Sequence, residues 1–301
     1  MHPRLFPRPH GVLVTCLSLI GALLLTACAT QQPAEVTTRM RPPVPLQPSV
    51  PLRPAVAKPY SAIVVDANSG RPIYTQADTQ VRFPASLAKM MTLYLVFEAM
   101  ESERITKATR IPISARAAGQ PPTKLYLKPG DSIDVDTAIR ALVVKSANDV
   151  ATAVAEHLGG SEANFSAKMT AKAWSLGMTA TTFTNASGLP DPGMRTTARD
   201  MATLGMALKR DFPGEFGYFS LRRFQRDGHT VVGHNRALDM IAGADGIKTG
   251  FTRAAGFNLA TSVRRDGRDL VAVVMGAESA RGRDEFMRDL IATTLPKAER
   301  R

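Results

Sequence analysis

Residues 86–100 read SLAKMMTLYLVFEAM, a run of strong helix formers with dense apolar content. This composition predicts a largely buried helix, and Pro84 just ahead of it suits a helix start. Ser86 and Lys89 lie three residues apart, so they share one face of that helix. The hydroxyl and the amine can therefore come within hydrogen-bond reach without help from distant parts of the chain.

The spacing of Ser86 and Lys89 allows a chemical interpretation and an ordinary one. A serine hydroxyl is a poor nucleophile until a base removes its proton, and a lysine with a pKa near ~10.4 is protonated at neutral pH. Burial and the positive end of a helix dipole both disfavour an ammonium, so Lys89 could become that base. In the ordinary interpretation Lys89 extends to solvent, and the spacing alone favours this second view.

A second polar motif, Ser146-Ala147-Asn148, lies between two stretches expected to be helical, Val135–Val144 and Asp149–His157. Asn148 could accept a hydrogen bond from a lysine ammonium and donate one to a substrate carbonyl. Ser146 could relay a proton to a leaving amine. Either side chain could instead cap the following helix, which is the common role of such residues.

A third motif, Lys248-Thr249-Gly250, falls on an expected strand. Lys248 and Thr249 suit a carboxylate, and a second ammonium would help to keep Lys89 neutral. Gly250 would let another backbone approach closely, although an exposed strand end explains the triplet equally well when it is taken alone. Together and in this order, the three motifs form a signature of β-lactamases and penicillin-binding proteins.

The remaining pattern predicts strands at both ends of the folded region. Tyr60–Asp66 and Arg71–Tyr74 flank a turn and predict a hairpin. Further strands are expected at Gly246–Thr249, Asn258–Arg264 and Asp269–Met275. Further helices are expected at Asn164–Ser175, Thr197–Lys209 and Asp284–Leu295. Because the strands from both ends must meet in one sheet, the sequence predicts a mixed α/β domain on an antiparallel sheet, with helices inserted between the strands.

The first 27 residues have the order of an export signal, with Arg4 and Arg8 ahead of an apolar run that is short for a bilayer span of ~20 residues. Leu25-Thr26-Ala27 before Cys28 resembles the bacterial lipobox, which implies cleavage before Cys28 and acylation of its thiol. A plain secretory signal or an uncleaved anchor is the alternative. Residues 28–59 are rich in proline and are expected to form an extended tether to a single domain, residues 60–301.

The composition excludes several classes of function. The chain has 301 residues, 44% of them apolar, and a net charge of +12, of which residues 1–59 supply +5. No run of basic residues is interleaved with aromatic ones, so we expect no nucleic-acid partner. The two cysteines, Cys16 and Cys28, precede the domain, so it has no disulfide. We expect no metal site, because the domain's three histidines lack cysteine partners and helical pairing; they are His157, His229 and His234.

From about Tyr60 to the last helix, the chain resembles the low-molecular-mass penicillin-binding proteins, the D-alanyl-D-alanine carboxypeptidases of serine peptidase family S11. The segments that carry the resemblance are FPASLAK (83–89), NASGL (185–189), TARDMA (197–202) and KTGFT (248–252). The resemblance implies an α/β (α+β) fold of the DD-peptidase and β-lactamase type, in which helices flank an antiparallel sheet and an all-helical lobe lies beside it. It implies no metal and no other cofactor.

The resemblance also implies roles for single residues. Ser86 would be the acyl-ester nucleophile, Lys89 its proton acceptor and Ser146 a proton relay, with Asn148 orienting Lys89 and the substrate amide. The expected reaction is attack on the penultimate D-Ala carbonyl of a peptidoglycan stem peptide, release of D-Ala and hydrolysis of the acyl-enzyme. β-Lactam antibiotics would be inhibitors.

The substrate-binding residues implied by the resemblance lie mainly on one strand. Lys248, Thr249 and Gly250 would meet the terminal carboxylate of the substrate, and Arg283 stands where the family has a carboxylate-binding arginine. The backbone N–H groups of Ser86 and Phe251 would form the oxyanion hole. Many relatives carry a second β-rich domain and a C-terminal amphipathic anchor. We expect neither here, and the lipid on Cys28 would replace the anchor at a bacterial membrane.

Three rival functions remain open. A class A-like β-lactamase needs a glutamate followed four residues later by asparagine, and Glu156, Glu162 and Glu215 all lack that partner. A DD-endopeptidase uses the same chemistry on cross-linked stem peptides and is barely separable by sequence. A non-catalytic peptidoglycan-binding lipoprotein would have no need to keep all the polar motif residues, so their presence argues against it.

Overall fold

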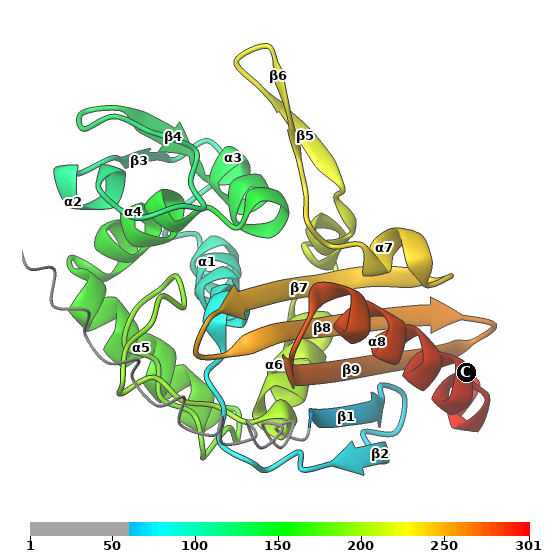
Figure 1. Cartoon of the computed structure of the whole chain (residues 1–301). Helices are drawn as coiled ribbons and strands as arrows, with labels where there is room; N and C mark the ends of the chain where they lie inside the picture. The colour runs from blue at the N-terminus through cyan, green and yellow to red at the C-terminus, as the bar shows by residue number, and fades with distance from the viewer. Residues whose placement is uncertain (1–59) are drawn as a thin grey trace, which may run out of the picture. The chain divides into compact units, whose positions relative to one another are not determined.

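The computed structural model describes residues 60–301, so the predicted signal, tether and Cys28 lie outside the described residues. A five-stranded antiparallel sheet forms its centre, in the order β2-β1-β9-β8-β7 (Figure 1). Its strands are β1 (Ser61–Asp66), β2 (Pro72–Gln76), β7 (Ala244–Thr252), β8 (Gly256–Arg265) and β9 (Arg268–Ala277). Because β1 pairs with β9, the predicted meeting of strands from both ends is confirmed.

The central strands are apolar on both faces, and both faces are covered. Along β9, Leu270 and Ala272 pack in the cluster that includes α8 (Ala280–Thr294), whereas Val271 and Val273 pack in the cluster of the helical block. Successive side chains of a strand point to opposite faces. A strand covered on both sides therefore shows a continuous apolar run, and this run made β9 predictable from the sequence.

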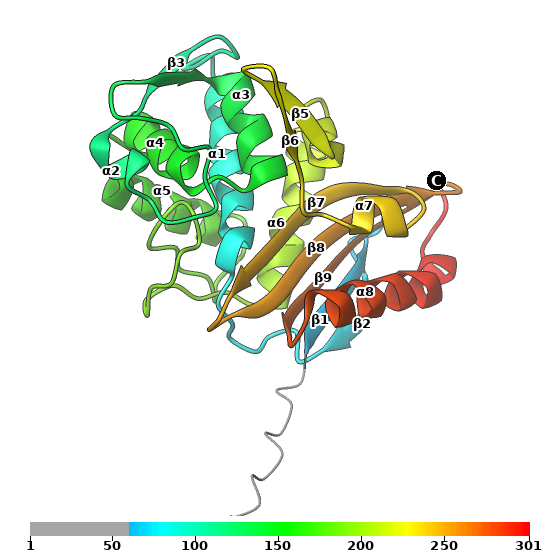
Figure 2. The same ribbon diagram turned by 45° about the horizontal axis from the view of Figure 1, so that its top comes forward.

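The chain between β2 and β7 is mainly helical and forms a block beside the sheet (Figures 1 and 2). Its helices are α1 (Lys89–Glu101), α2 (Ala115–Ala118), α3 (Val135–Arg140), α4 (Asn148–Gly159), α5 (Glu162–Ser175) and α6 (Ala198–Asp211). Nearly every side chain of α1 is buried, as predicted, and α6 packs against β1 and β9. A 3-10 turn (Ala85–Ala88) precedes α1, and a π-helical turn (Ala141–Lys145) follows α3.

Helix starts are displaced from the expected positions where a capping serine extends the helix. The last helix begins at Ala280 rather than Asp284, because the Ser279 side chain accepts a hydrogen bond from the Gly282 N–H. Ser161 caps α5 in the same way, through the N–H of Asn164. Such caps satisfy N–H groups that have no partner within the helix, so the helix can start earlier than its apolar pattern suggests.

Several short elements were not predicted. They include the hairpins β3 (Arg110–Pro112) with β4 (Ser132–Asp134) and β5 (Arg223–Arg226) with β6 (His229–Val232). They also include the short helices and helical turns α2, α7 (Ala237–Met240), Phe216–Ser220 and Leu295–Lys297. Asp227 and Gly228 both have positive φ in the β5–β6 turn, and an Asp-Gly pair is a strong hairpin signal. Across residues 60–301, no helix is at once long enough and apolar enough to cross a bilayer.

Candidate active site

Ser86 and Lys89 meet at the start of α1. The Lys89 Nζ lies 3.3 Å from Ser86 Oγ and donates to Asn148 Oδ1 at 2.8 Å and to the Ser187 carbonyl at 2.6 Å. The lysine side chain is fully buried, so the interpretation in which it extends to solvent is wrong. A neutral amine has two N–H groups and one lone pair. With both N–H groups directed to carbonyl oxygens, the lone pair is left for the Ser86 hydroxyl.

The environment of Lys89 favours its neutral form. Burial holds the pKa of Lys89 well below its usual range, and the nearby charge of Lys248 lowers that pKa further. The carboxylate of Asp149 acts in the opposite direction. The two lowering effects are those expected from the sequence, and both favour the neutral form that a general base requires.

Asn148 is fixed by contacts at each of its polar groups. Its side-chain N–H₂ donates to Pro121 O at 3.1 Å and its backbone N–H to Thr123 O at 2.7 Å, while Oδ1 accepts from Lys89. The residue that caps α4 is Ala147, and no side chain caps that end. The capping interpretation of Ser146 and Asn148 is therefore wrong, and Asn148 instead joins Lys89 to the segment around residue 121.

Ser146 follows the π-helical turn in a left-handed conformation, with φ of 61°. Single π turns are common at functional sites, and few residues other than glycine adopt a positive φ. The Ser146 hydroxyl is buried and is one of the side-chain groups without a hydrogen-bond partner among the described residues. A buried hydroxyl left unpaired is unfavourable, which makes it available to a bound molecule.

Lys248, Thr249 and Gly250 lie on β7, as predicted. Lys248 is 2% exposed, its Nζ donates to Thr249 O at 3.0 Å, and burial together with the charge of Arg283 lowers its pKa to about 7. A Cβ on Gly250 would lie 3.1 Å from both the Pro84 carbonyl and the Ser86 N atom. Glycine therefore lets β7 pack directly on the turn that carries Ser86, as expected for a strand glycine.

Phe251 and Arg283 occupy different surroundings. The Phe251 ring is 54% exposed and stacks on Phe257 with ring centroids 4.2 Å apart. Arg283 is buried in the first turn of α8, where its guanidinium binds Asp284 and donates to the Asn258 carbonyl of β8. The Arg283 guanidinium already binds Asp284, so the binding of a substrate carboxylate by Arg283 stays a prediction.

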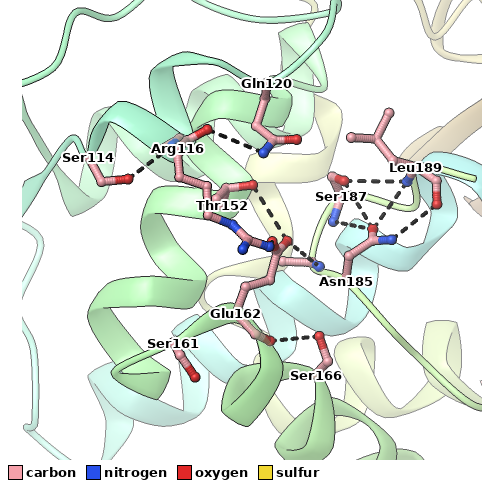
Figure 3. A network of polar contacts seen from close by, with 12 residues as sticks. Ser114, Arg116, Gln120, Thr152, Ser161, Glu162, Ser166, Asn185, Ser187 and Leu189 are labelled. Atoms are coloured by element: carbon pink, nitrogen blue, oxygen red, sulfur yellow. Dashed lines mark hydrogen bonds and ion pairs between the residues drawn. The ribbon is translucent and has the colours of Figure 1, made fainter. Parts of the chain in front are cut away.

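The loop formed by residues 185–189 supplies a group that the sequence reasoning missed, the carbonyl of Ser187. Asn185 Oδ1 accepts the N–H groups of Ser187, Gly188 and Leu189, which folds the loop on itself (Figure 3). Gly188 has φ of 79°, and a Cβ there would lie 1.8 Å from the Ala85 carbonyl. Sequence cannot show a backbone carbonyl as a ligand of Lys89. The one available signal was an asparagine followed by small residues, which is typical of such turns.

Glu162 ties this loop to the helical block (Figure 3). Its carboxylate accepts the Ala186 N–H at 3.2 Å and the Thr152 hydroxyl at 3.5 Å, and it forms an ion pair with Arg116 at 2.7 Å. These contacts engage both carboxylate oxygens with groups other than Ser86. Glu162 therefore supports the loop that carries the Ser187 carbonyl.

Asp149 holds the other side of the site. Its buried carboxylate accepts the backbone N–H groups of Leu125 at 2.9 Å, Leu127 at 3.3 Å and Val150 at 2.9 Å. This clamp fixes the segment whose Pro121 and Thr123 carbonyls bind Asn148. Within residues 60–301, no group of three or more His, Cys, Asp or Glu side chains is arranged to hold a metal ion.

Curated relatives share much of this sequence. DacA, a D-alanyl-D-alanine carboxypeptidase of Escherichia coli K12, is 35% identical over 238 residues, which is 77% of this chain and 59% of DacA. The carboxypeptidase DacF of Bacillus subtilis is 31% identical over 229 residues, 74% of this chain and 59% of DacF. The chain thus spans about three fifths of the length of these relatives.

Solved structures share the fold. Penicillin-binding protein 5 from Haemophilus influenzae superposes with a TM-score of 0.74 at 32% identity, over 79% of this chain and 70% of that one. Penicillin-binding protein D2 from Listeria monocytogenes in its ampicillin-bound form gives a TM-score of 0.72 at 29% identity, over 78% of this chain and 96% of that one. These neighbours confirm the predicted DD-peptidase type of α/β fold.

The profile of the D-alanyl-D-alanine carboxypeptidase family, peptidase S11, matches residues 49–279 of this chain. That span contains the Ser86–Lys89 turn, the 146–148 motif, the 185–189 loop and the strand with Lys248. The match runs from before β1 to the end of β9, so it covers the sheet and the helical block alike. The chain therefore belongs to the D-alanyl-D-alanine carboxypeptidase family of serine peptidases, S11.

Proposed function

We propose that this chain is a serine D-Ala-D-Ala carboxypeptidase that removes the terminal D-Ala from peptidoglycan stem peptides through an acyl-enzyme on Ser86. One observation carries the proposal: the buried Lys89 amine has both its N–H groups directed to Asn148 Oδ1 and Ser187 O, and its third position faces Ser86 Oγ. Membership of the family supports the choice of substrate.

In the acylation step, Lys89 takes the hydroxyl proton of Ser86 as Oγ attacks the penultimate D-Ala carbonyl. The backbone N–H groups of Ser86 and Phe251 would stabilise the oxyanion, since the close contact of β7 with the Ser86 turn brings these two segments together. The scissile C–N bond then breaks. The proton held by Lys89 passes through the Ser146 hydroxyl to the leaving amine, which departs as D-Ala.

In the deacylation step, Lys89 is neutral again and takes a proton from water, which attacks the ester carbonyl. The Ser86 oxygen leaves and receives that proton back from Lys89, so the enzyme returns to its starting state. The fixed position of Lys89 serves both steps, because the same amine faces the same oxygen throughout.

The terminal carboxylate of the substrate would bind Lys248 and Thr249. Lys248 has a pKa of about 7, so part of the population carries a positive charge at neutral pH, and a bound carboxylate would favour that charged form. A β-lactam carries a carboxylate and a reactive carbonyl in a similar arrangement. We therefore expect β-lactams to acylate Ser86, as the ampicillin-bound form of the Listeria protein suggests for this fold.

The activity is tested by D-Ala release from a stem pentapeptide and from a cross-linked stem-peptide dimer. We expect release from the pentapeptide, slow or no cleavage of the dimer, and no activity in Ser86→Ala. Preferential cleavage of the dimer would instead identify a DD-endopeptidase. Penicillin is tested as a third substrate, and its rapid turnover would identify a β-lactamase. Inactivity on the pentapeptide, the dimer and penicillin would identify a binding protein.

We also propose the cellular setting that the sequence predicts: a signal at residues 1–27, a lipid on Cys28, a tether at 28–59 and the catalytic domain at 60–301. The lipid would hold the domain at the periplasmic face of a bacterial membrane, close to peptidoglycan. Mass analysis of the mature N-terminus tests this. A diacylglyceryl-modified Cys28 is expected, and Cys28→Ser should release the protein from the membrane fraction. A mature N-terminus that starts at another residue and carries no lipid would contradict the lipid anchor.

A further inference from the structure

A pocket of about 300 Å³ lies at the base of the β5–β6 hairpin, which projects beside the helical block (Figures 1 and 2). Apolar side chains from three parts of the chain line it: Val143 and Val144 of the π turn, Leu221 before β5, and Ile247 of β7. The volume lies at the small end of ligand pockets, which hold ~300–1,000 Å³, so it suits a short peptide segment rather than a folded partner. The proposed catalytic steps do not use this space.

The rim of this pocket carries an excess of positive charge. Three arginines line it, Arg222, Arg223 and Arg236, against one acid, Asp239. Arg222 binds Asp239 at 2.5 Å, whereas the exposed guanidinium groups of Arg223 and Arg236 have no ion-pair or hydrogen-bond partner within residues 60–301. Two such guanidinium groups beside apolar walls favour a ligand that has two carboxylates and an apolar part.

Asn235 adds a buried amide to the wall of the same pocket. Neither its side-chain oxygen nor its side-chain nitrogen has a hydrogen-bond partner in the described part of the chain. A buried polar group left unpaired is unfavourable, so this amide is the kind of group that a ligand would satisfy. A peptide unit has both the donor and the acceptor that complement an amide, which favours a peptide over a simple anion.

Positive charge from the active site also reaches this pocket. His234 lines the pocket, and its pKa is lowered by burial and then by the charges of Lys248 and Lys145. Charges that disfavour a protonated imidazole favour a carboxylate at the same place. The electrostatics of the pocket and the free arginines therefore select the same kind of ligand.

The pocket lies beyond the carboxylate end of the proposed substrate. Its residue on β7 is Ile247, which precedes Lys248, whereas the scissile carbonyl belongs further along the strand, at Phe251. The substrate of a carboxypeptidase ends with the carboxylate at Lys248, so no residue of that substrate continues into the pocket. An occupant of the pocket is therefore a second molecule.

We propose that this pocket is a second peptide site, which binds a neighbouring stem peptide through two carboxylates without cleaving it. The identity of the ligand as a stem peptide rests on the proposed function, which places the domain among stem peptides. The preference for an acidic peptide rests on the pocket alone. A second contact of this kind would hold the enzyme on the polymer between cleavages, because the next binding event becomes intramolecular.

Three peptides and one phosphate separate these features: Nα-acetyl-valyl-glutamate, Nα-acetyl-valyl-glutamine, Nα-acetyl-glycyl-glutamate and glycerol phosphate. Each is titrated into the Ser86→Ala protein while NMR follows the ring signals of His234, with those of His157 in the last turn of α4 as a reference. We expect valyl-glutamate to shift His234 and not His157. It should bind ~5-fold more tightly than valyl-glutamine, as for one partly exposed ion pair, and ~10-fold more tightly than glycyl-glutamate, which lacks the apolar side chain.

Variants of the rim assign this affinity to the pocket. Arg223→Gln and Arg236→Gln should each weaken the binding of valyl-glutamate ~5-fold, and the double variant should bind valyl-glutamate and valyl-glutamine equally. Arg71→Gln, at an exposed arginine between β1 and β2, is the matched control and should change neither affinity. Denaturant unfolding checks that the variants keep the fold. Affinities insensitive to both rim variants, or tighter binding of glycerol phosphate than of valyl-glutamate, would overturn the proposal.

D-Ala release from the stem pentapeptide by the wild-type protein distinguishes failure of this site from failure of the proposed function. If no D-Ala is released but the His234 shifts depend on Arg223 and Arg236, the acidic-peptide site stands and the carboxypeptidase assignment fails. If D-Ala is released and no probe shifts His234, the carboxypeptidase stands and the second site fails. Cleavage of the cross-linked dimer that slows in the rim variants would make the pocket part of the substrate site, which also overturns the proposal.

Discussion

Lys89 and Lys248 are both buried, and the proposed mechanism requires opposite protonation states of them. Lys89 must be neutral to remove a proton, whereas Lys248 must be charged to bind a carboxylate. The charge on Lys248 lowers the pKa of Lys89, and burial lowers both. Only Lys89 has two carbonyl acceptors for the N–H groups of a neutral amine. At the scale of the residue, burial and hydrogen-bond partners therefore account for the different protonation states proposed for the two lysines.

The protonation states proposed for Lys89 and Lys248 predict the pH dependence of kcat/KM. Activity requires neutral Lys89 and charged Lys248, so it should rise with pH through the low pKa of Lys89 and fall above about 7, as free Lys248 loses its proton. The alkaline limb of kcat should lie at higher pH than that of kcat/KM, because a bound substrate carboxylate favours the ammonium form of Lys248. Lys248→Arg should shift the alkaline limb of kcat/KM to higher pH, since arginine stays charged. An unchanged limb in that variant would exclude Lys248 as its source.

Lys248 should also reduce the stability of the fold. Its pKa is about 7 when folded and 10.5 when free, so between these pH values the unfolded chain binds a proton that the folded chain does not. The free energy of unfolding must then rise with pH across that window. Lys248→Met should unfold at higher denaturant concentration at pH 7 and lose this part of the slope. Lys128→Met, at an exposed lysine, is the control and should keep the wild-type slope.

At the scale of elements, the sequence predicted the long helices and the central strands because their apolar patterns are strong. It did not predict the 3-10 turn before α1 or the π turn before Ser146, since apolar periodicity does not distinguish these turns from an α-helix. It also missed the role of the 185–189 loop, because a main-chain carbonyl has no signature in side chains. These unpredicted turns and this loop are the parts that set the angles between Ser86, Lys89 and Ser146.

The fit of Gly188 against Ala85 predicts a large effect of one methyl group. Gly188→Ala adds a Cβ 1.8 Å from a carbonyl oxygen at a positive φ, so we expect a loss of several kcal/mol of stability and a fall in acylation rate of ~100-fold or more. Gly130→Ala is the matched control, because Gly130 has φ of 90° with nothing within 4 Å. It should lose only the ~1–2 kcal/mol of a left-handed residue. Denaturant unfolding and β-lactam acylation rates measure both effects.

Glu162 predicts an effect on catalysis from outside the site. Glu162→Gln weakens the ion pair with Arg116 and the bond to the Ala186 N–H, so the Ser187 carbonyl should hold Lys89 less firmly. We expect acylation by a β-lactam to slow ~10-fold, and removal of a buried charge-assisted bond to cost about 1–3 kcal/mol. Glu285→Gln, which breaks the exposed Arg281–Glu285 pair, should change neither quantity. Equal acylation rates in the two variants would contradict this role.

At the scale of the whole molecule, the site lies where four distant parts of the chain meet: the turn before α1, the junction of the π turn with α4, the 185–189 loop, and β7. The pairing of β1 with β9 closes the sheet, and the helical block lies against it. The sequence order of strands, helices and strands was enough to predict this arrangement. The contacts of the loops around Lys89 required the structure, because they join residues up to 98 positions apart.

The central claim is that Ser86 forms the acyl-enzyme, and trapping the protein with a labelled penicillin tests it most directly. Trypsin cleaves after Arg82 and after Lys89, which releases the peptide FPASLAK, whose one hydroxyl side chain is Ser86. We predict that this peptide carries the added mass of the intact penicillin, and that Ser86→Ala abolishes the adduct. Lys89→Met should abolish it too, on the longer peptide 83–104 that trypsin releases from that variant. An adduct on any other peptide, or full labelling of Ser86→Ala, would contradict the account.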